Sequence, residues 1–179
     1  MGIEKLFDVL LEFINLFRFW EVVHEFEQGI VLQFGKFRRV VGPGIRFILP
    51  MGIDCIIVDN ITFKTSNMRS QTLTMRDKNT LVVSPVIAYR IHDIKKFLLE
   101  VESAEDALRD CTHGTVGEMV RHSTLDEMMT DEWHAKLYSK VREQGFQFGI
   151  EVLQVRLSDF GSLRTIRLIN SNDYVEAVE

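Results

Sequence analysis

Residues 27–50 read EQGIVLQFGKFRRVVGPGIRFILP, and short apolar runs alternate in this stretch with turn-forming residues. Residues 29–34 and 45–49 are rich in Ile, Val, Leu and Phe, which is the composition of β-strands. Turn formers bound these runs: Gly35-Lys36, Gly42-Pro43-Gly44 and Pro50-Met51-Gly52. The stretch therefore predicts consecutive short strands joined by tight turns.

The same pattern continues toward the C-terminus as far as residue 91. Further β-prone runs occupy residues 55–59 and 80–91, and Asp77-Lys78-Asn79 supplies a turn before the second of them. We predict an antiparallel β meander for this half of the chain. Pro85 lies inside the longest run, and because proline has no backbone N–H to donate, that strand should be an edge strand or contain a bulge there.

After the meander, the apolar period changes from that of a strand to that of a helix. Four residues stand where an N-cap could open a helix: Asp93, Ser103, Thr124 and Asp131. Ser103 followed by Asp106 is close to a capping box. Residues 150–158 (IEVLQVRLS) alternate again and predict a last strand that returns to the sheet. The predicted fold class is α+β.

The N-terminal segment, residues 3–20, has the apolar repeat of an amphipathic helix. Charged residues recur along it, from Glu4 to Arg18, which argues against a simple transmembrane helix. A helix with one very apolar face can instead lie in the membrane interface. The side chains that we expect to enter the bilayer from this helix are Leu6, Phe7, Leu10, Phe13, Phe17 and Trp20.

Two interpretations of this helix stay open. Its polar face is mainly acidic, whereas interfacial helices are usually basic, so the same apolar face could pack on protein instead. Phe47 and Ile48, after the Gly42-Pro43-Gly44 turn, are expected to assist membrane insertion. The basic residues of the neighbouring turns would either meet phosphate headgroups or form a solvated hairpin; they are Lys36, Arg38, Arg39 and Arg46.

Several motifs in a fixed order resemble the stomatin/prohibitin family, also called the SPFH or band 7 family. They are the strand and FGK turn at residues 27–36, the GPG loop at 42–50, the strand ending AYRIHD at 88–93, LDE at 125–127 and the closing strand at 148–159. Ile94 and Phe148 depart from this pattern, because the family usually has proline and tryptophan there. The resemblance implies a membrane-associating helix at residues 1–21, an SPFH domain at 22–160 and a short tail at 161–179 without the family's long coiled coil.

The resemblance also implies a function. Family members are membrane scaffolds that organise lipids and proteins, form homo-oligomers and often restrain a membrane protease or channel. We therefore expect a membrane-associated scaffold of this kind, with its domain on the cytosolic face because no signal peptide is visible. The alternative is a soluble regulatory protein whose N-terminal helix docks on a partner protein.

The sequence contains no pattern typical of catalysis or of cofactor binding. The five histidines form no H-x-x-H or H-E-x-x-H pair, and Cys55 and Cys111 form no C-x-x-C, so we predict no metal site. Nucleotide and nucleophile motifs are absent, and we expect no enzyme and no cofactor. The net charge of −5 provides no general attraction for nucleic acid, so we expect no nucleic-acid partner.

Overall fold

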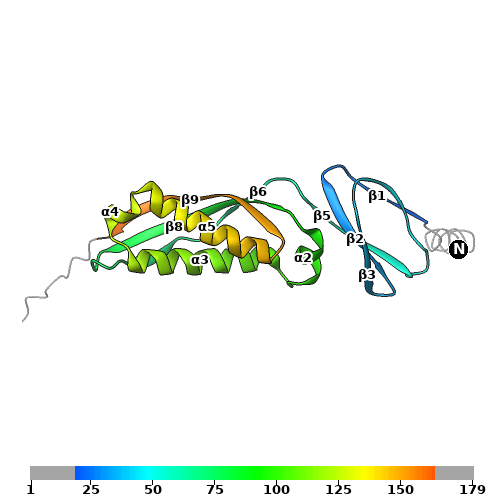
Figure 1. Ribbon diagram of the computed structural model, residues 1–179, viewed down its shortest axis with the longest axis horizontal. Coiled ribbons are helices and arrows are strands. Elements are labelled where there is room, and N and C mark those ends of the chain that lie inside the picture. Colours follow the sequence, from blue (N-terminus) through cyan, green and yellow to red (C-terminus); the bar gives the residue numbers. More distant parts are fainter. Residues whose placement is uncertain (1–18, 164–179) are drawn as a thin grey trace, which may run out of the picture.

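The computed structural model of the protein describes residues 19–163 (Figure 1). Within these residues the chain forms nine strands and four helices, and the predicted α+β class is confirmed. The strands are β1 (Trp20–Val23), β2 (Glu27–Gln33), β3 (Lys36–Val41), β4 (Gly44–Phe47), β5 (Asp54–Asn60), β6 (Lys64–Asn67), β7 (Gln71–Thr74), β8 (Thr80–Ile91) and β9 (Ile150–Leu163). The helices are α2 (Ile94–Leu99), α3 (Ala104–His122), α4 (Leu125–Met128) and α5 (Asp131–Gln147).

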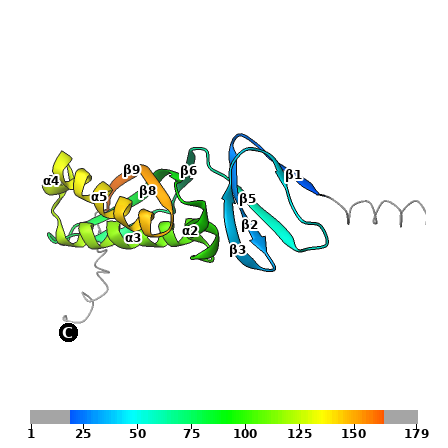
Figure 2. The same cartoon turned by 45° about the vertical axis from the view of Figure 1, so that its right-hand side comes forward.

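The strands and helices divide into two regions, which we call the β lobe (residues 19–60) and the body (residues 64–163). Figure 1 shows the described residues as an elongated molecule, with the β lobe at one end and α4 near the opposite end. In Figure 2, a view turned by 45°, α2 lies between the helices of the body and the sheet of the β lobe. The two regions are joined through residues 61–63.

The body is a two-layer sandwich built on β8. β9 pairs with β8 along its whole length on one side, and β6 and β7 pair with successive parts of its other side, all antiparallel. α3 and α5 pack side by side on one face of this sheet (Figure 1). Their apolar stripes are buried against β8 and β9, and the largest fully buried side chains there include Leu108, Leu137, Ile87 and Ile150.

Proline 85 lies in the middle of this sheet and not at its edge. The register between β8 and β9 shifts between Ser84 and Pro85, which is the bulge that the sequence offered as one of two alternatives. The edge alternative is wrong, since β8 has a partner on both sides. The predicted last strand is confirmed and extends to Leu163, beyond residue 158.

Side-chain caps open three of the helices. Asp93 accepts hydrogen bonds from the backbone N–H groups of Lys95 and Lys96, and Thr124 forms a full capping box with Glu127. Ser103 stands at the predicted N-cap, but its hydroxyl donates to the Asp106 carboxylate instead of capping the backbone. The N-cap of α5 is Thr130 and not the predicted Asp131, because the Thr130 hydroxyl accepts the Trp133 N–H.

The β lobe consists of a three-stranded sheet, in the order β3-β2-β5, and a two-stranded ribbon of β1 and β4. One face of the sheet buries Ile30 in the main core of the body. The other face meets the ribbon in a small core of Val23, Val31 and Val41, with Ile56 packed against it. Residues Gly29 and Ile57 approach so closely that a Cβ on Gly29 would lie 2.6 Å from the Ile57 carbonyl oxygen.

Candidate functional site

The ribbon of β1 and β4 has an apolar outer face. In its register, Trp20 pairs with Phe47 and Val22 pairs with Ile45. Directly opposed residues of an antiparallel pair lie on the same face, so these four side chains form one continuous surface. Their exposed fractions are 54% for Trp20, 49% for Val22, 65% for Ile45 and 75% for Phe47. A sheet in water usually exposes its polar face, and this ribbon exposes its apolar one.

The inner face of the ribbon explains this orientation. Val23, next along β1, is buried against Val31 and Val41 of the three-stranded sheet. Because strand side chains alternate, burying Val23 turns Val22 and Trp20 outward. Arg46 stabilises the preceding turn: its Nε donates to the Gly42 carbonyl at 3.0 Å and its second terminal nitrogen donates to the Pro43 carbonyl at 2.8 Å.

Two neighbouring turns extend the apolar surface. The Phe34 N–H donates to the Ile53 carbonyl at 2.8 Å, which joins the β2–β3 turn to the loop at residues 48–53. Asp54 closes that loop, because its buried carboxylate accepts the Leu49 N–H at 3.1 Å. Phe34, Leu49 and Met51 remain exposed at these turns.

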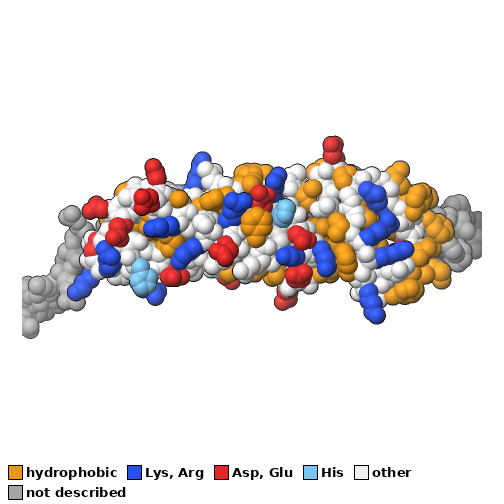
Figure 3. Space-filling model, viewed as in Figure 1, with side chains coloured by type: hydrophobic (Ala, Val, Ile, Leu, Met, Phe, Trp, Pro, Cys, Tyr) orange, Lys and Arg blue, Asp and Glu red, His pale blue; other side chains and the backbone are white. Residues whose placement is uncertain are grey.

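We call the whole exposed surface the apolar tip. It comprises Phe19, Trp20, Val22, Phe34, Ile45, Phe47, Leu49 and Met51. Figure 3 shows hydrophobic side chains gathered at this end of the molecule. Large contiguous apolar patches are rare on soluble monomers and usually mark a surface that binds protein or membrane.

The residues predicted to enter a membrane have different outcomes. Leu6, Phe7, Leu10, Phe13 and Phe17 lie outside the described residues. Trp20 was predicted on a helix, and that placement is wrong: it is the first residue of β1, because pairing with Phe47 overrides the helical spacing. Phe47 is exposed on the tip, whereas Ile48 is half-buried and its N–H donates to the Phe19 carbonyl at 2.9 Å.

Sequence reasoning missed the other tip residues, chiefly Val22, Ile45 and Met51. The available signal was the short apolar-polar-apolar alternation in WEV at residues 20–22 and in IRF at residues 45–47. Strands of four residues are too short for this alternation to stand out. No helix within residues 19–163 has the length and hydropathy that crossing a bilayer requires.

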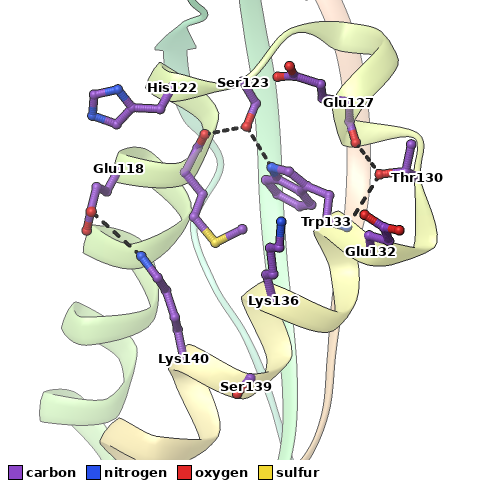
Figure 4. Close-up of a pocket in the computed structure, with 11 residues that line it drawn as sticks. Glu118, His122, Ser123, Glu127, Thr130, Glu132, Trp133, Lys136, Ser139 and Lys140 are labelled. Atoms are coloured by element: carbon purple, nitrogen blue, oxygen red, sulfur yellow. Dashed lines mark hydrogen bonds and ion pairs between the residues drawn. The ribbon is translucent and has the colours of Figure 1, made fainter.

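A groove lies at the other end of the molecule, between α3, α4 and α5. This groove has a volume of about 630 Å³, and Trp133 and Met119 supply its apolar lining. Figure 4 shows the Trp133 ring between the helices, with Nε1 donating to the Ser123 hydroxyl at 2.8 Å. That hydroxyl donates in turn to the Met119 carbonyl at 2.7 Å. Ser123 is therefore engaged in holding Trp133 in place and is not aimed at a ligand.

Both acidic and basic side chains line the groove. Lys140 on α5 lies 3.7 Å from Glu118 on α3 (Figure 4). Glu127 accepts from Arg76 at 3.1 Å, outside the groove. Across residues 19–163, no three His, Cys, Asp or Glu side chains gather closely enough to hold a metal ion. The apolar tip is thus the surface with the clearer functional character.

Comparison with known proteins agrees with the fold. A family model described as "SPFH domain / Band 7 family" matches residues 21–166. An uncharacterized protein of Archaeoglobus fulgidus is 29% identical over 140 residues, which are 77% of this chain and 56% of that protein. Protein HflK of Vibrio cholerae is 34% identical over 108 residues, which are 60% of this chain and 27% of that protein.

A further relative has a name that states a role. It is "Modulator of FtsH protease HflK" of Escherichia coli K12, and it is 29% identical over 109 residues, which are 61% of this chain and 26% of that protein. The chain therefore spans about half of the archaeal relative and about a quarter of the HflK proteins.

Proposed function

Because this chain belongs to the SPFH domain / Band 7 family, we propose that it is a membrane-associated scaffold protein whose apolar tip enters the bilayer interface. The observation that carries this proposal is the outward-facing apolar side of the β1–β4 ribbon. Burying a large apolar side chain is worth roughly 1.5 to 3 kcal/mol. Partial insertion of several such side chains would hold the protein on a bilayer without a spanning helix.

The predicted N-terminal helix would act together with the tip. β1 begins at Trp20, so the segment that carries Leu6, Phe7, Leu10, Phe13 and Phe17 enters the domain directly at the apolar tip. This continuity supports a single membrane-facing end made of both. The predicted cytosolic orientation of the domain belongs to this proposal.

The proposed role toward other proteins is to hold or restrain a client. The likeness to a modulator of the FtsH protease supports a membrane protease as the client class, and a channel is the other candidate. We propose that copies self-associate on the membrane as homo-oligomers. The role is structural and regulatory rather than catalytic, and it requires no cofactor.

The rival function is that of a soluble regulatory protein whose apolar tip and N-terminal helix dock on a partner protein. An exposed apolar surface is expected both of a protein that binds membrane and of one that docks on a partner protein. The family membership favours the membrane, and binding to pure lipid separates the two functions.

Liposome flotation of the full chain tests the proposal, at low and at high salt. The test variant is Trp20→Glu/Phe47→Glu, and the matched control is Phe63→Glu/Met129→Glu, which changes two apolar residues of similar exposure in and beside the body. We expect the control to float as the unmodified chain does and the tip variant to bind at least about tenfold more weakly. A Phe13→Glu/Phe17→Glu variant measures the share of the N-terminal helix.

High salt should leave binding to neutral vesicles nearly unchanged, because it rests mainly on apolar burial. If the unmodified chain stays with the soluble fraction, the membrane role is wrong and the tip is a protein-docking surface. If the tip variant floats as well as the control, the ribbon does not contact lipid.

A further inference from the structure

Charge is distributed very unevenly along this acidic chain. Residues 28–53 contain four basic residues and no Asp or Glu. The whole chain has 21 Lys and Arg against 26 Asp and Glu, so its remaining residues carry 17 basic against 26 acidic side chains. The uninterrupted basic stretch includes five residues of the apolar tip, from Phe34 to Met51. Positive charge is therefore concentrated in the part of the chain that also builds the tip.

The fold places the basic residues of β3 on the side of the ribbon. Lys36 pairs with Gln33 and Arg39 pairs with Val31, so both share the sheet face of Val31, against which the ribbon packs. The register shifts between Val31 and Leu32, which leaves Arg38 as the extra residue of a β-bulge. Phe34, a tip residue, stands at the turn two residues before Lys36. Figure 3 shows Lys and Arg side chains on the same end of the molecule as the apolar cluster.

Three of the four basic residues are available to a ligand. Arg46 is committed to the carbonyls of Gly42 and Pro43. Lys36 and Arg39 are exposed, and neither makes an ion pair within residues 19–163. The Arg38 side chain is 51% exposed and lies 3.9 Å from the buried Asp54 carboxylate, at the outer limit of an ion pair. We call Lys36, Arg38 and Arg39 the basic rim.

We propose that the basic rim binds the phosphate groups of anionic phospholipids, so that the protein prefers anionic membranes and docks on them tip first. This inference rests on the proposed membrane role and names its lipid class. Apolar side chains reach the acyl boundary while neighbouring Lys and Arg extend to the headgroup level. Each Lys or Arg near an anionic surface strengthens binding about fivefold. The acidic remainder of the chain is repelled by the same surface, which disfavours any other orientation.

The test compares two kinds of vesicle with the full chain. One is pure phosphatidylcholine, and in the other phosphatidylglycerol makes up roughly one third of the lipid, a composition chosen to give a negative surface. We expect the unmodified chain to bind the anionic vesicles at least about tenfold more tightly. Added salt should reduce this difference while leaving binding to the neutral vesicles in place.

The rim variant is Lys36→Gln/Arg39→Gln, which keeps Arg38 beside buried Asp54 and so protects the fold. We expect it to lose about 25-fold in affinity for anionic vesicles and almost nothing for neutral ones. The matched control is Arg121→Gln/Lys136→Gln, which removes two exposed basic residues of the body, at the other end of the molecule. This control should keep the full preference for anionic lipid, and circular dichroism should show both variants folded.

Three results would overturn the inference. One is equal binding of the unmodified chain to both kinds of vesicle, which leaves the membrane role intact and removes the lipid preference. Another is an equal loss of affinity for anionic vesicles in the Arg121→Gln/Lys136→Gln control, which would indicate that the lipid preference depends on net charge and not on the basic rim. A third is release of the chain from anionic vesicles by inorganic phosphate at matched ionic strength, which would indicate that the rim binds free phosphate. Failure to bind either vesicle would overturn the membrane role itself.

Discussion

In the body, large apolar side chains are buried between two layers, and α3 and α5 contribute Leu108, Val116 and Leu137 to this core. In the β lobe, only Val23, Val31 and Val41 form a separate core, while residues as large as Trp20 and Phe47 are exposed. The body is therefore stabilised by apolar surface that is buried inside the chain itself. The apolar content of the β lobe is directed outward and is available for binding.

The junction shows how the smaller region is held. Ile30 of the β lobe is fully buried in the core of the body. Lys64 bridges the two regions, with its Nζ 3.1 Å from Asp59 of β5 and 2.9 Å from Glu105 of α3. Lys95 of α2 lies 5.1 Å from the centre of the Phe37 ring. The β lobe thus depends on the body for its orientation.

The largest expected contrast comes from placing a charge in each region. Leu137→Glu puts a carboxylate into a site that is 1% exposed, and we expect a loss of more than about 5 kcal/mol, enough to prevent folding. Phe47→Glu changes a residue that is already exposed and should alter the thermal midpoint little. Circular dichroism melts of both variants measure the contrast. Equal destabilisation would show that the apolar tip is structural.

The next contrast removes volume from each core. Leu108→Ala should cost about 3 kcal/mol of unfolding free energy, since it leaves a cavity in the main core. Val31→Ala should cost about 2 kcal/mol and act chiefly on β2, β3 and β5. Urea unfolding gives the two free energies, and hydrogen exchange locates the affected amides. Loss of protection throughout the body in the Val31 variant would contradict the small, separate core.

A smaller effect is expected from the bridge between the regions. Burial by itself lowers the pKa of Lys64, but hydrogen bonds and attraction from Glu105 and Asp59 outweigh it and raise that pKa. Lys64→Met should cost about 1 kcal/mol, because both ion pairs are partly solvated. A double-mutant cycle with Asp59→Asn, which removes the ion pair that joins the two regions, should give a coupling energy of about half that amount. Additive effects would mean that the bridge does not hold the regions together.

The smallest effect concerns acid sensitivity at α4, far from the β lobe. A hydrogen bond from the Thr124 backbone N–H, and the nearby Arg76 guanidinium, lower the pKa of Glu127 below its ordinary value of 4.5. A lowered pKa in the folded state stabilises the fold above pH 4.5, and this contribution is lost as pH falls through the folded-state pKa. Urea midpoints of Glu127→Gln should therefore lie slightly below those of the unmodified chain at neutral pH.

At acid pH the two sets of midpoints should converge. A gap that persists there would indicate that Glu127 acts through packing and not through its charge. The Arg76→Gln variant is a useful companion, since it removes the guanidinium and keeps the capping box.

Local signals were sufficient for much of the fold. The run at residues 80–91 is β8 with the predicted bounds, and Asp93 and Thr124 are the predicted helix caps. These features depend on residues within a few positions of one another. The ribbon was not predictable in the same way, because β1 and β4 are four residues each and their pairing joins positions more than twenty apart. Trp20 is an example, because its three-residue spacing from Phe17 fits a helix, whereas pairing with Phe47 of β4 places it in a strand.

By itself, the sequence determined the α+β alternation, the turns around Gly35 and Gly44, the helix caps and the concentration of positive charge in residues 28–53. Each of these depends on composition or on neighbours along the chain. Only the tertiary structure decided that Trp20, Val22, Ile45 and Phe47 share one outward face, and that Lys36 and Arg39 share the sheet face against which the ribbon packs. Which side of a strand faces water is set by the partner that buries its other side, and here that partner is the Val31 face of a separate sheet.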